Sequence, residues 1–372
     1  MKIGIDAKWY FEGPPSGKRV VRGLWHAMLD LDDDHEYFIF LNRRHRHREF
    51  PVGKKRVTKC YVWAGNNLLS NVFVLPWYSY ADKLDAILYQ NFVSPFGRDY
   101  RVAYIHDVLF LSNPEYYTIV ERIYFAPLKL LTYTAHAIVT VSVEEKKRLL
   151  RFKFSSNPDK ITVAHHGVDS GFRPRELHEP EAILRVKQKF GLPERFLLFV
   201  GRLNLRKNID NLLRALPLVQ DKSIPLVIVG ADDWRKSDHQ NTIQQLGIAD
   251  RVIFTGAVFE DLDIIYSLAT LFCFPSHAES FGLPPLEAMA SGVPVVVSGT
   301  TSLPEVCGEA GTYVNPDDPV QIGGAIDNLL SNAQLYDEKV RLGLRQAEKF
   351  NWRKSAEAVI GCMGNSAKGD YH

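Results

Sequence analysis

The chain has 372 residues, of which 46% are hydrophobic and 24% charged, and its formal net charge at pH 7 is +2. This composition is typical of a folded protein and excludes disordered and collagen-like classes, while the length exceeds what a single core usually spans. No stretch approaches 18 uninterrupted apolar residues, and the N-terminus reads as a strand rather than a signal peptide. The four cysteines have no paired spacing, which indicates neither a zinc site nor a disulfide framework. We therefore expect two domains, a cytoplasmic location and no membrane-spanning helix.

The charge is distributed unevenly. Residues 1–175 carry 26 Lys and Arg against 18 Asp and Glu, a net charge of +8, and the remainder carries −6. The densest basic runs are Arg43 to Arg48 and Lys54 to Arg56. Such runs can meet anionic lipid headgroups, a phosphorylated acceptor or nucleic acid. A solvated loop with surplus charge is the alternative.

Both parts of the chain alternate short apolar runs with amphipathic stretches, the pattern of parallel sheets covered by helices. The strands expected in the first part are Ile3 to Asp6, Tyr37 to Leu41, Ala86 to Tyr89, Val102 to Ile105, Ala137 to Val141 and Ile161 to Ala164. Those expected in the second part are Phe196 to Val200, Leu226 to Val229, Val252 to Thr255, Leu271 to Phe274 and Pro294 to Val297. The polar, proline-bearing segment 173–195 divides the two sets and is predicted to be the interdomain linker, with one helix inside it.

The predicted fold class is therefore α/β, with two Rossmann-like domains facing across a cleft. The N-terminal domain is expected to cover residues 1–175 and the C-terminal domain residues 185–350. Ligands of such sheets bind at the carboxyl ends of the parallel strands, where several of the predicted strands end in a small or polar residue.

The segment 275–294 carries most of the recognisable chemistry. Pro284 suits the first turn of a helix, and Gly282 before it lets the backbone approach a ligand closely. The amides of a helix N-terminus bind phosphate. Glu279 in the loop and Glu287 on the helix flank this anion site, so one carboxylate can reach a sugar and the other a ribose.

At this segment the sequence resembles family 4 glycosyltransferases of the GT-B fold, whose E-x7-E motif matches Glu279 and Glu287. Further matching segments follow in the same order and spacing along most of the chain. They are Ile105-His106-Asp107 with Pro114-Glu115-Tyr116, Val139 to Lys147, His166 to Asp169, Val200 to Leu203 with Lys207-Asn208, Val252 to Gly256 and Ser302 to Val306. The resemblance implies a retaining hexosyltransferase that uses a nucleotide diphosphate sugar without a cofactor. It also implies a C-terminal helix, at about 351–372, that crosses back to the N-terminal domain.

The resemblance also implies roles for individual residues. Arg202 and Lys207 follow a strand and offer cations to the diphosphate leaving group. Glu287 is expected to bind the ribose, Glu279 the hydroxyls of the donor sugar, and His106 to lie against the reacting centre. The remaining expected contacts are the amides of Phe281, Gly282 and Leu283 with phosphate or sugar, Val258 with the base, and Gly17 with the diphosphate. Ser16-Gly17-Lys18 departs from the paired glycines of the family, and Lys18 is a candidate for a further cation at the phosphate site.

Other interpretations of the same residues stay open at this point. Asp261-Leu262-Asp263 resembles a metal-holding D-x-D, although we expect it to begin a helix, and fixed cations remove the need for a metal. An epimerase or hydrolase of the same fold would act on the donor without an acceptor. A non-catalytic partner would only bind the sugar nucleotide. Gly13 to Arg19 half-matches a P-loop, but its spacing is one residue short.

The donor and the acceptor are expected from the resemblance alone. The His106-Asp107 strand end and the segment Ser302 to Glu305 resemble branches rich in mannosyltransferases, so GDP-mannose is the expected donor, with UDP- and dTDP-sugars as alternatives. Bacterial relatives extend glycans carried on a lipid diphosphate, which predicts a lipid-linked glycan acceptor and no nucleic-acid partner. We expect peripheral, salt-sensitive binding to the anionic inner face of the plasma membrane through the basic runs.

Overall fold

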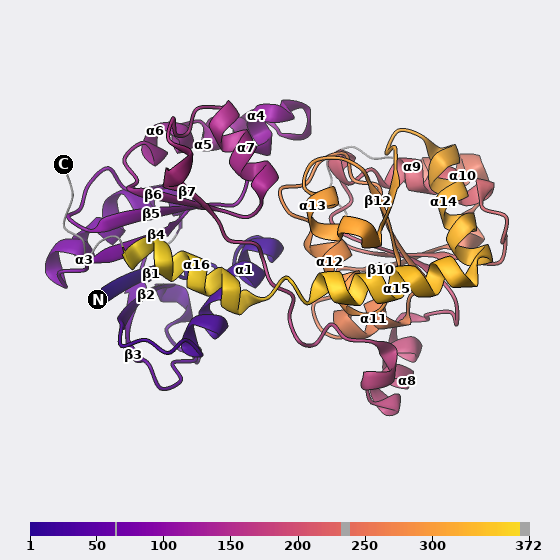
Figure 1. The fold of residues 1–372 in the computed structure, drawn as a ribbon, viewed down its shortest axis with the longest axis horizontal. Coiled ribbons are helices and arrows are strands. Elements are labelled where there is room, and N and C mark those ends of the chain that lie inside the picture. Colours follow the sequence, from indigo (N-terminus) through magenta and orange to yellow (C-terminus); the bar gives the residue numbers. More distant parts are fainter. Residues whose placement is uncertain (64, 232–238, 365–372) are drawn as a thin grey trace. The chain divides into compact units, whose positions relative to one another are not determined.

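The computed structural model describes residues 1–63, 65–231 and 239–364, and the chain divides into two compact units (Figure 1). The first unit contains Met1–Gly167 and the segment from Asn351 onward, and the second contains Val168–Phe350. Each unit is a parallel sheet covered by helices, which confirms the predicted class of two Rossmann-like α/β domains. Within the described ranges, no helix combines the length and hydropathy needed to cross a bilayer.

The sheet of the first unit has the strand order β3-β2-β1-β4-β5-β6-β7, all pairs being parallel. Its strands are β1 (Lys2–Asp6), β2 (Glu36–Asn42), β3 (Arg56–Val62), β4 (Ala86–Gln90), β5 (Tyr100–Ile105), β6 (Ala137–Thr140) and β7 (Ile161–Val163). The six strands predicted from sequence are confirmed. β3 was not predicted, because it lies at the edge of the sheet and alternates exposed polar residues with few buried ones.

The helices of the first unit follow from local signals in the sequence. They are α1 (Pro15–Leu29), α2 (Asn67–Leu69), α3 (Leu75–Ala81), α4 (Leu109–Ser112), α5 (Ile119–Phe125), α6 (Pro127–Thr132), α7 (Val143–Arg151) and α16 (Trp352–Gly364). Thr118 and Glu121 form a capping box at α5, and Ser142 caps α7. The C-terminal α16 packs against α1 and beside β5, β6 and β7, and Ser355 donates a hydrogen bond to the carbonyl of His165. Residues 365–372 of the predicted crossover helix lie outside the described residues.

The sheet of the second unit has the order β10-β9-β8-β11-β12-β13. Its strands are β8 (Leu197–Val200), β9 (Leu226–Val229), β10 (Val252–Gly256), β11 (Leu271–Phe274), β12 (Val295–Ser298) and β13 (Gly311–Val314). Its helices are α8 (Pro180–Phe190), α9 (Ile209–Ala215), α10 (His239–Leu246), α11 (Leu262–Leu268), α12 (Leu283–Ala290), α13 (Leu303–Cys307), α14 (Pro319–Ser331) and α15 (Ala333–Ala347). The five predicted strands are confirmed, and the short edge strand β13 was missed.

The position predicted for the interdomain linker was wrong. The boundary between the units falls between Gly167 and Val168, so the segment 173–195 belongs to the second unit. Its helix α8 packs against α11, and Arg185 and Lys189 of α8 form ion pairs with Asp261 at 3.0 and 2.8 Å. Prolines and charges made this segment look like a linker, whereas its contacts make it part of the domain.

Candidate active site

The strand order of the second sheet changes direction between β8 and β11. Open parallel sheets bind ligands at the carboxyl ends of their strands at such a switch point. From β8 the chain enters a loop and a short 3-10 helix, Leu205–Lys207, and from β11 it enters the loop that leads to α12. The two loops are joined because the amide of His277 donates to the carbonyl of Arg206 at 2.9 Å. Side chains from both loops therefore gather at one edge of the sheet.

Glu279 lies at the centre of a buried charge cluster at this edge. Its Oε1 is 2.7 Å from Nζ of Lys207 and 2.6 Å from the hydroxyl of Ser276, which donates to it. Its Oε2 is 2.9 Å from Nη1 of Arg206. The ammonium of Lys207 also lies 4.6 Å from the ring centroid of Phe274. One carboxylate thus orients two cations that come from the neighbouring loop.

The cluster holds more positive than negative charge. Burial by itself would raise the pKa of Glu279, but the Arg206 and Lys207 cations together lower it well below its ordinary value. Burial lowers the pKa of Lys207 to about 8; Glu279 opposes this shift, and the neighbouring Arg206 and Arg202 add to it. Both pKa values are lowered, which favours the charged form of Glu279 and disfavours that of Lys207; burial is the main cause for Lys207, and repulsion between the cations that share one carboxylate adds to it. A bound anion would relieve that repulsion.

The loop before α12 is fixed by the residues that follow β12. The hydroxyl of Ser302 donates to the carbonyls of Glu279 and Phe281 at 3.1 and 2.6 Å, and the hydroxyl of Thr301 accepts from the amide of Glu279 at 2.9 Å. Gly282, the residue before α12, has a φ of +122° and no room for a side chain, since a Cβ would lie 2.8 Å from Leu303. The amides that begin α12 are therefore held at a defined place beside the charge cluster.

The other predicted donor-site residues lie at the same edge in different environments. Glu287 is on α12 and only 1% exposed, whereas Arg202 is exposed on the loop after β8. Phe281 and Leu283 are buried at the start of α12, and Val258 is partly exposed in the loop after β10. The structure joins Glu279 and Lys207 directly and places the others on loops or the helix around them.

The first sheet also changes direction, between β1 and β4, and a buried polar network lies at that point. Nζ of Lys8, just after β1, is 2.7 Å from Asp6 Oδ1 and donates to Asn71 Oδ1 at 2.5 Å. The side-chain amide of Asn71 donates to the carbonyl of Gln90, at the end of β4, at 3.1 Å. Gln90 Oε1 in turn lies 2.7 Å from Nε2 of His106, which follows β5. The network links the ends of three strands to His106.

His106 is a neutral group in this environment. Its ring lies against those of Trp9 and Tyr104, with centroids 5.4 and 4.8 Å away, and burial lowers its pKa to about 3. We assign the proton to Nε2 because the partner atom, Gln90 Oε1, is an acceptor. His106 can therefore accept a hydrogen bond at Nδ1 or make an apolar contact without adding charge.

Gly17 lies in the first turn of α1 rather than in the loop that the sequence predicted. The ring of Trp9 fills the space where a side chain would be, with Cε3 2.8 Å from an ideal Cβ position. Lys18 is partly exposed next to it. In the loop after β1, the ring of Trp9 thus packs directly on the first turn of α1.

Comparison with known proteins shows the family. A family described as "Glycosyl transferases group 1" matches residues 181–345. The O-antigen chain mannosyltransferase B of Escherichia coli is 32% identical over 277 residues, which cover 73% of this chain and 71% of that protein. The chain belongs to the group 1 glycosyltransferases. The resemblance stated from the sequence motifs is confirmed.

Solved structures show that this glycosyltransferase has the GT-B fold. Sucrose-phosphate synthase from Thermosynechococcus elongatus matches all of this chain and all of its own, with a TM-score of 0.76 at 21% identity. HepE from Anabaena, in complex with UDP and glucose, matches 98% of this chain and 100% of its own, with a TM-score of 0.73 at 17% identity.

Several residues of the glycosyltransferase site were missed from the sequence. Arg206 binds Glu279 and the carbonyl of Ala278, yet only Arg202 and Lys207 were selected. Its position directly before Lys207 was a usable signal. Gln90 and Asn71 gave no signal, because single amides at a strand end and on a helix have no motif.

The D-x-D segment of this glycosyltransferase connects two helices of the second unit through ion pairs. Asp261 precedes α11 in a left-handed conformation, with φ of +65°, and forms ion pairs with α8. The helix start was predicted, although Asp261 lies just before the first turn rather than within it. In the described part of the chain, no group of three or more His, Cys, Asp or Glu side chains is arranged to hold a metal ion.

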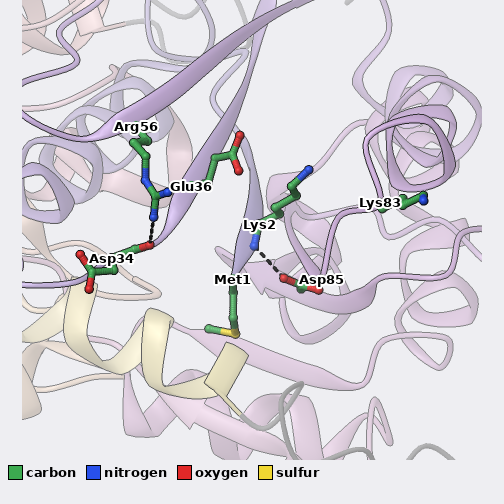
Figure 2. Close-up of a pocket in the computed structure, with 7 residues that line it drawn as sticks. All are labelled: Met1, Lys2, Asp34, Glu36, Arg56, Lys83 and Asp85. Atoms are coloured by element: carbon green, nitrogen blue, oxygen red, sulfur yellow. Dashed lines mark hydrogen bonds between the residues drawn. The ribbon is translucent and has the colours of Figure 1, made fainter.

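A cavity of about 390 Å³ lies in the first unit, away from both switch points. Figure 2 shows its wall, which is formed by Met1, Lys2, Asp34, Glu36, Arg56, Lys83 and Asp85. These residues stand at the amino ends of the strands, opposite the edge where α/β sheets bind ligands. The amide of Lys2 donates to Asp85 Oδ2, and Arg56 donates to the carbonyl of Asp34, both at 2.7 Å. We assign this cavity no part in the reaction.

Proposed function

We propose that this glycosyltransferase moves a hexose, with mannose favoured, from a nucleotide diphosphate sugar to a growing glycan, with retention of the anomeric configuration. The observation that carries the proposal is the buried cluster of Arg206 and Lys207 around Glu279, next to the start of α12. Surplus positive charge and oriented helix amides at a switch point suit a diphosphate. The name of the Escherichia coli relative supports mannose, and the HepE complex supports a nucleotide-linked donor.

In this proposal each site residue has a distinct task. Arg202 and Lys207 bind the diphosphate, with amides of Phe281, Gly282 and Leu283 beside them. Glu279 holds Lys207 and Arg206 in position and remains the candidate for the sugar hydroxyls. The remaining contacts are Glu287 with the ribose, Val258 with the base, Gly17 with the diphosphate and His106 with the reacting sugar.

The chemistry proposed is stabilisation of the leaving diphosphate. As the bond from the anomeric carbon breaks, negative charge gathers on the diphosphate oxygens, and fixed cations lower the energy of that state. The acceptor hydroxyl attacks from the face that the diphosphate leaves, which retains the configuration without a covalent sugar-enzyme intermediate. No divalent metal or cofactor is needed in this scheme. Activity should therefore persist in EDTA, and a strict requirement for Mg²⁺ or Mn²⁺ would contradict it.

The donor is tested by ligand stabilisation and turnover. GDP should raise the thermal midpoint more than UDP or dTDP, and stabilisation by UDP alone would reject GDP-mannose. A panel of nucleotide sugars with and without a glycan acceptor separates the remaining alternatives. Consumption of donor without acceptor would indicate an epimerase or hydrolase, and binding without turnover would indicate a non-catalytic partner.

We further propose that the acceptor is linked to a lipid diphosphate and that the cytoplasmic enzyme binds the inner face of the plasma membrane. The arginines at 43, 44, 46 and 48 are exposed, and the first 175 residues carry a net charge of +8. Lys55 instead forms an ion pair with Asp33 at 3.1 Å, so the run at 54–56 contributes less free charge than predicted. Exposed basic residues contribute about 1 kcal/mol each near an anionic surface. Replacing the four arginines with serine should weaken binding to anionic vesicles at low salt.

A further inference from the structure

A continuous helical segment of the first unit presents large apolar side chains to its surface. It consists of α2, a π-helical turn (Ser70–Val74) and α3. Leu69, Phe73, Trp77 and Tyr80 recur on it at intervals of four, four and three residues, which places them along one side. The ring of Phe96 lies 6.3 Å from that of Phe73. We call these five residues the aromatic stripe.

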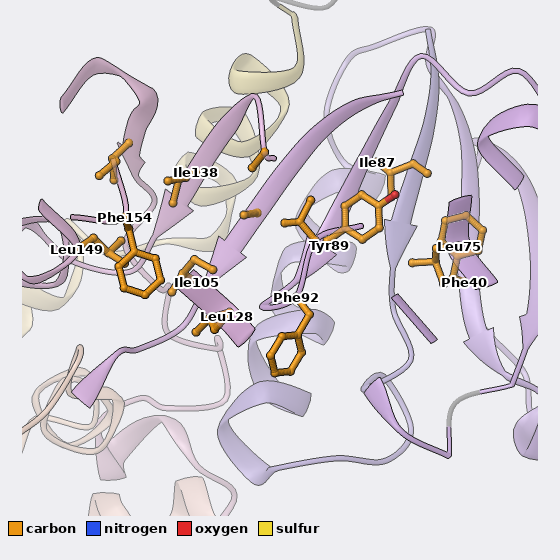
Figure 3. Close-up of a cluster of buried hydrophobic side chains, with 14 of the residues drawn as sticks. Phe40, Leu75, Ile87, Tyr89, Phe92, Ile105, Leu128, Ile138, Leu149 and Phe154 are labelled. Atoms are coloured by element: carbon orange, nitrogen blue, oxygen red, sulfur yellow. The ribbon is translucent and has the colours of Figure 1, made fainter. Parts of the chain in front are cut away.

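The aromatic stripe is exposed while the opposite side of its helix is packed. Its four aromatic side chains are each more than half exposed. Leu75, on the same segment, is fully buried in the core cluster that covers one face of the sheet (Figure 3). With 150–250 Å² per aromatic side chain, the stripe exposes roughly 500 Å² of mainly apolar surface. That equals the largest patch of a typical monomer, which is often functional.

Charge is absent from the helix and present at its borders. Residues 66–81 contain no Asp, Glu, Lys or Arg. Asp82 and Lys83 follow α3 and Arg98 follows Phe96; the two cations are exposed and Asp82 is partly exposed. A helix that faces water normally carries charged residues on its outer side. This one has an uncharged outer side with cations next to it.

A second exposed apolar area lies on helices that cover the same face of the sheet. Ile119, Val120 and Ile123 of α5 and Leu130 of α6 are each about two-thirds exposed or more, with Arg122 and Lys129 among them. The loop after β4 ties the two areas together through Ser94. Its hydroxyl donates to the carbonyl of Val72 at 2.9 Å, and its carbonyl accepts from the hydroxyl of Thr134 at 3.3 Å. Leu75 of α3 and Leu128 of α6 pack in the same core cluster, so both helices cover the same face of the sheet (Figure 3).

We infer that the aromatic stripe inserts into an anionic lipid bilayer. Trp and Tyr favour the interface between headgroups and acyl chains, and neighbouring cations can reach the phosphates. A second copy of the chain is disfavoured as the occupant, because it would bring two strongly basic first units together. The inference deepens the proposed membrane association: the basic run attracts the surface, and the stripe supplies the apolar contact that salt does not screen.

The test uses the full chain and vesicles of phosphatidylcholine alone or mixed with phosphatidylglycerol. The double variant Phe73→Ser/Trp77→Ser should lower the vesicle partition coefficient at least tenfold in both low salt and 1 M salt. The matched control Leu184→Ser/Val320→Ser removes exposed apolar residues from helices of the second unit and should bind as the unchanged chain does. Trp77→Phe should remove most of the vesicle-induced blue shift of tryptophan fluorescence. An unchanged thermal midpoint and nucleotide-induced shift would show that the variants fold.

Three outcomes would overturn the inference. These are equal binding by the double variant and the unchanged chain, no vesicle binding by the unchanged chain, and a concentration-dependent dimer that the double variant abolishes. Sugar transfer to a short soluble acceptor is measured separately. If transfer fails with every donor while the binding pattern holds, the proposed function is wrong and the membrane surface stands.

Discussion

The two switch points of this glycosyltransferase are built from different chemistry. At the second sheet, Glu279 is surrounded by Lys207 and Arg206, and burial keeps these charges close and desolvated. At the first sheet, the group that follows the strand is His106, held neutral by burial and hydrogen-bonded to Gln90. The charged residues of the same network, Asp6 and Lys8, are buried and neutralise each other in an ion pair.

This difference shows how one architecture, used twice in a chain, can serve two purposes. A switch point with surplus fixed charge suits an anionic leaving group, because its cations need no reorganisation when charge develops. A switch point with neutral groups can contact a sugar without competing for that anion. Variants at each point should therefore differ in size of effect and in pH dependence.

The largest combined effect, on stability and turnover together, is expected for Lys207→Ala. Removing one partner of a buried ion pair leaves Glu279 with Arg206 alone, which should cost about 3 kcal/mol of the free energy of unfolding and lower turnover by about 100-fold or more. Denaturant unfolding and initial rates measure the two effects. Lys187→Ala, which breaks an ion pair with the exposed Glu194, is the control and should leave both the stability and the initial rate unchanged. Equal effects of the two variants would show that the buried cluster has no special function.

Variants of Arg202 and Glu287 test whether the switch point of the second sheet binds the nucleotide-sugar donor. Arg202→Ala and Glu287→Ala should each weaken nucleotide-sugar binding or turnover by about 2 to 4 kcal/mol, because charge-assisted contacts to the donor are lost. Arg202 is exposed, so its variant should unfold at the same denaturant concentration as the unchanged chain. Glu287 is buried, and Glu287→Gln serves as the variant that keeps the volume. Normal nucleotide binding by both Arg202→Ala and Glu287→Gln would remove these residues from the donor site.

His106 and Glu279 should each make the chain less stable in acid, but at different pH values. The loss caused by His106 in the first unit should begin at a higher pH than the loss caused by Glu279 in the second. The folded pKa of His106 lies near 3 and the unfolded value near 6.5, so below pH 6.5 the unfolded chain takes up a proton that the folded chain does not. Stability is lost as the pH falls through that window. For Glu279, whose folded pKa is depressed, the loss begins only below the unfolded value near 4.5.

The variant His106→Gln isolates this contribution. The loss of unfolding free energy between pH 7 and pH 5 should become smaller by about 2 kcal/mol, whereas Glu279→Gln should leave the difference between these two pH values nearly unchanged. Chemical denaturation at both pH values measures it. An identical pH dependence of His106→Gln and the unchanged chain would mean that His106 takes up its proton at the same pH in the folded and unfolded states.

The smallest effects are expected at the D-x-D segment. Asp261 pairs with Arg185 and Lys189, which are largely exposed, and such pairs contribute about 1 kcal/mol or less. Asp261→Asn and Asp263→Asn should keep turnover within about twofold in this metal-independent scheme. A loss of activity that added Mn²⁺ restores would instead identify the segment as a metal site.

The sequence by itself determined the fold and the loop before α12. Buried parallel strands are continuous apolar runs, and eleven of them could be read from their β-branched and aromatic residues. The edge strands β3 and β13 escaped, because a strand exposed on one side loses that signal. Gly282, Pro284 and Glu287 were readable because a helix start and its glycine have a fixed spacing in the chain.

The tertiary structure alone decided which side chains act on one another. Glu279 was predicted to contact a sugar, yet its carboxylate binds Lys207 and Arg206, more than 70 residues away in the chain. Gln90 reaches His106 only because β4 and β5 are neighbours in the sheet. The side of a helix that faces solvent was likewise undecided by the sequence: the residues of the aromatic stripe are exposed, whereas Leu75 on the same segment is buried in the core. Partners, protonation and exposure depend on strand order and packing, which local sequence patterns do not encode.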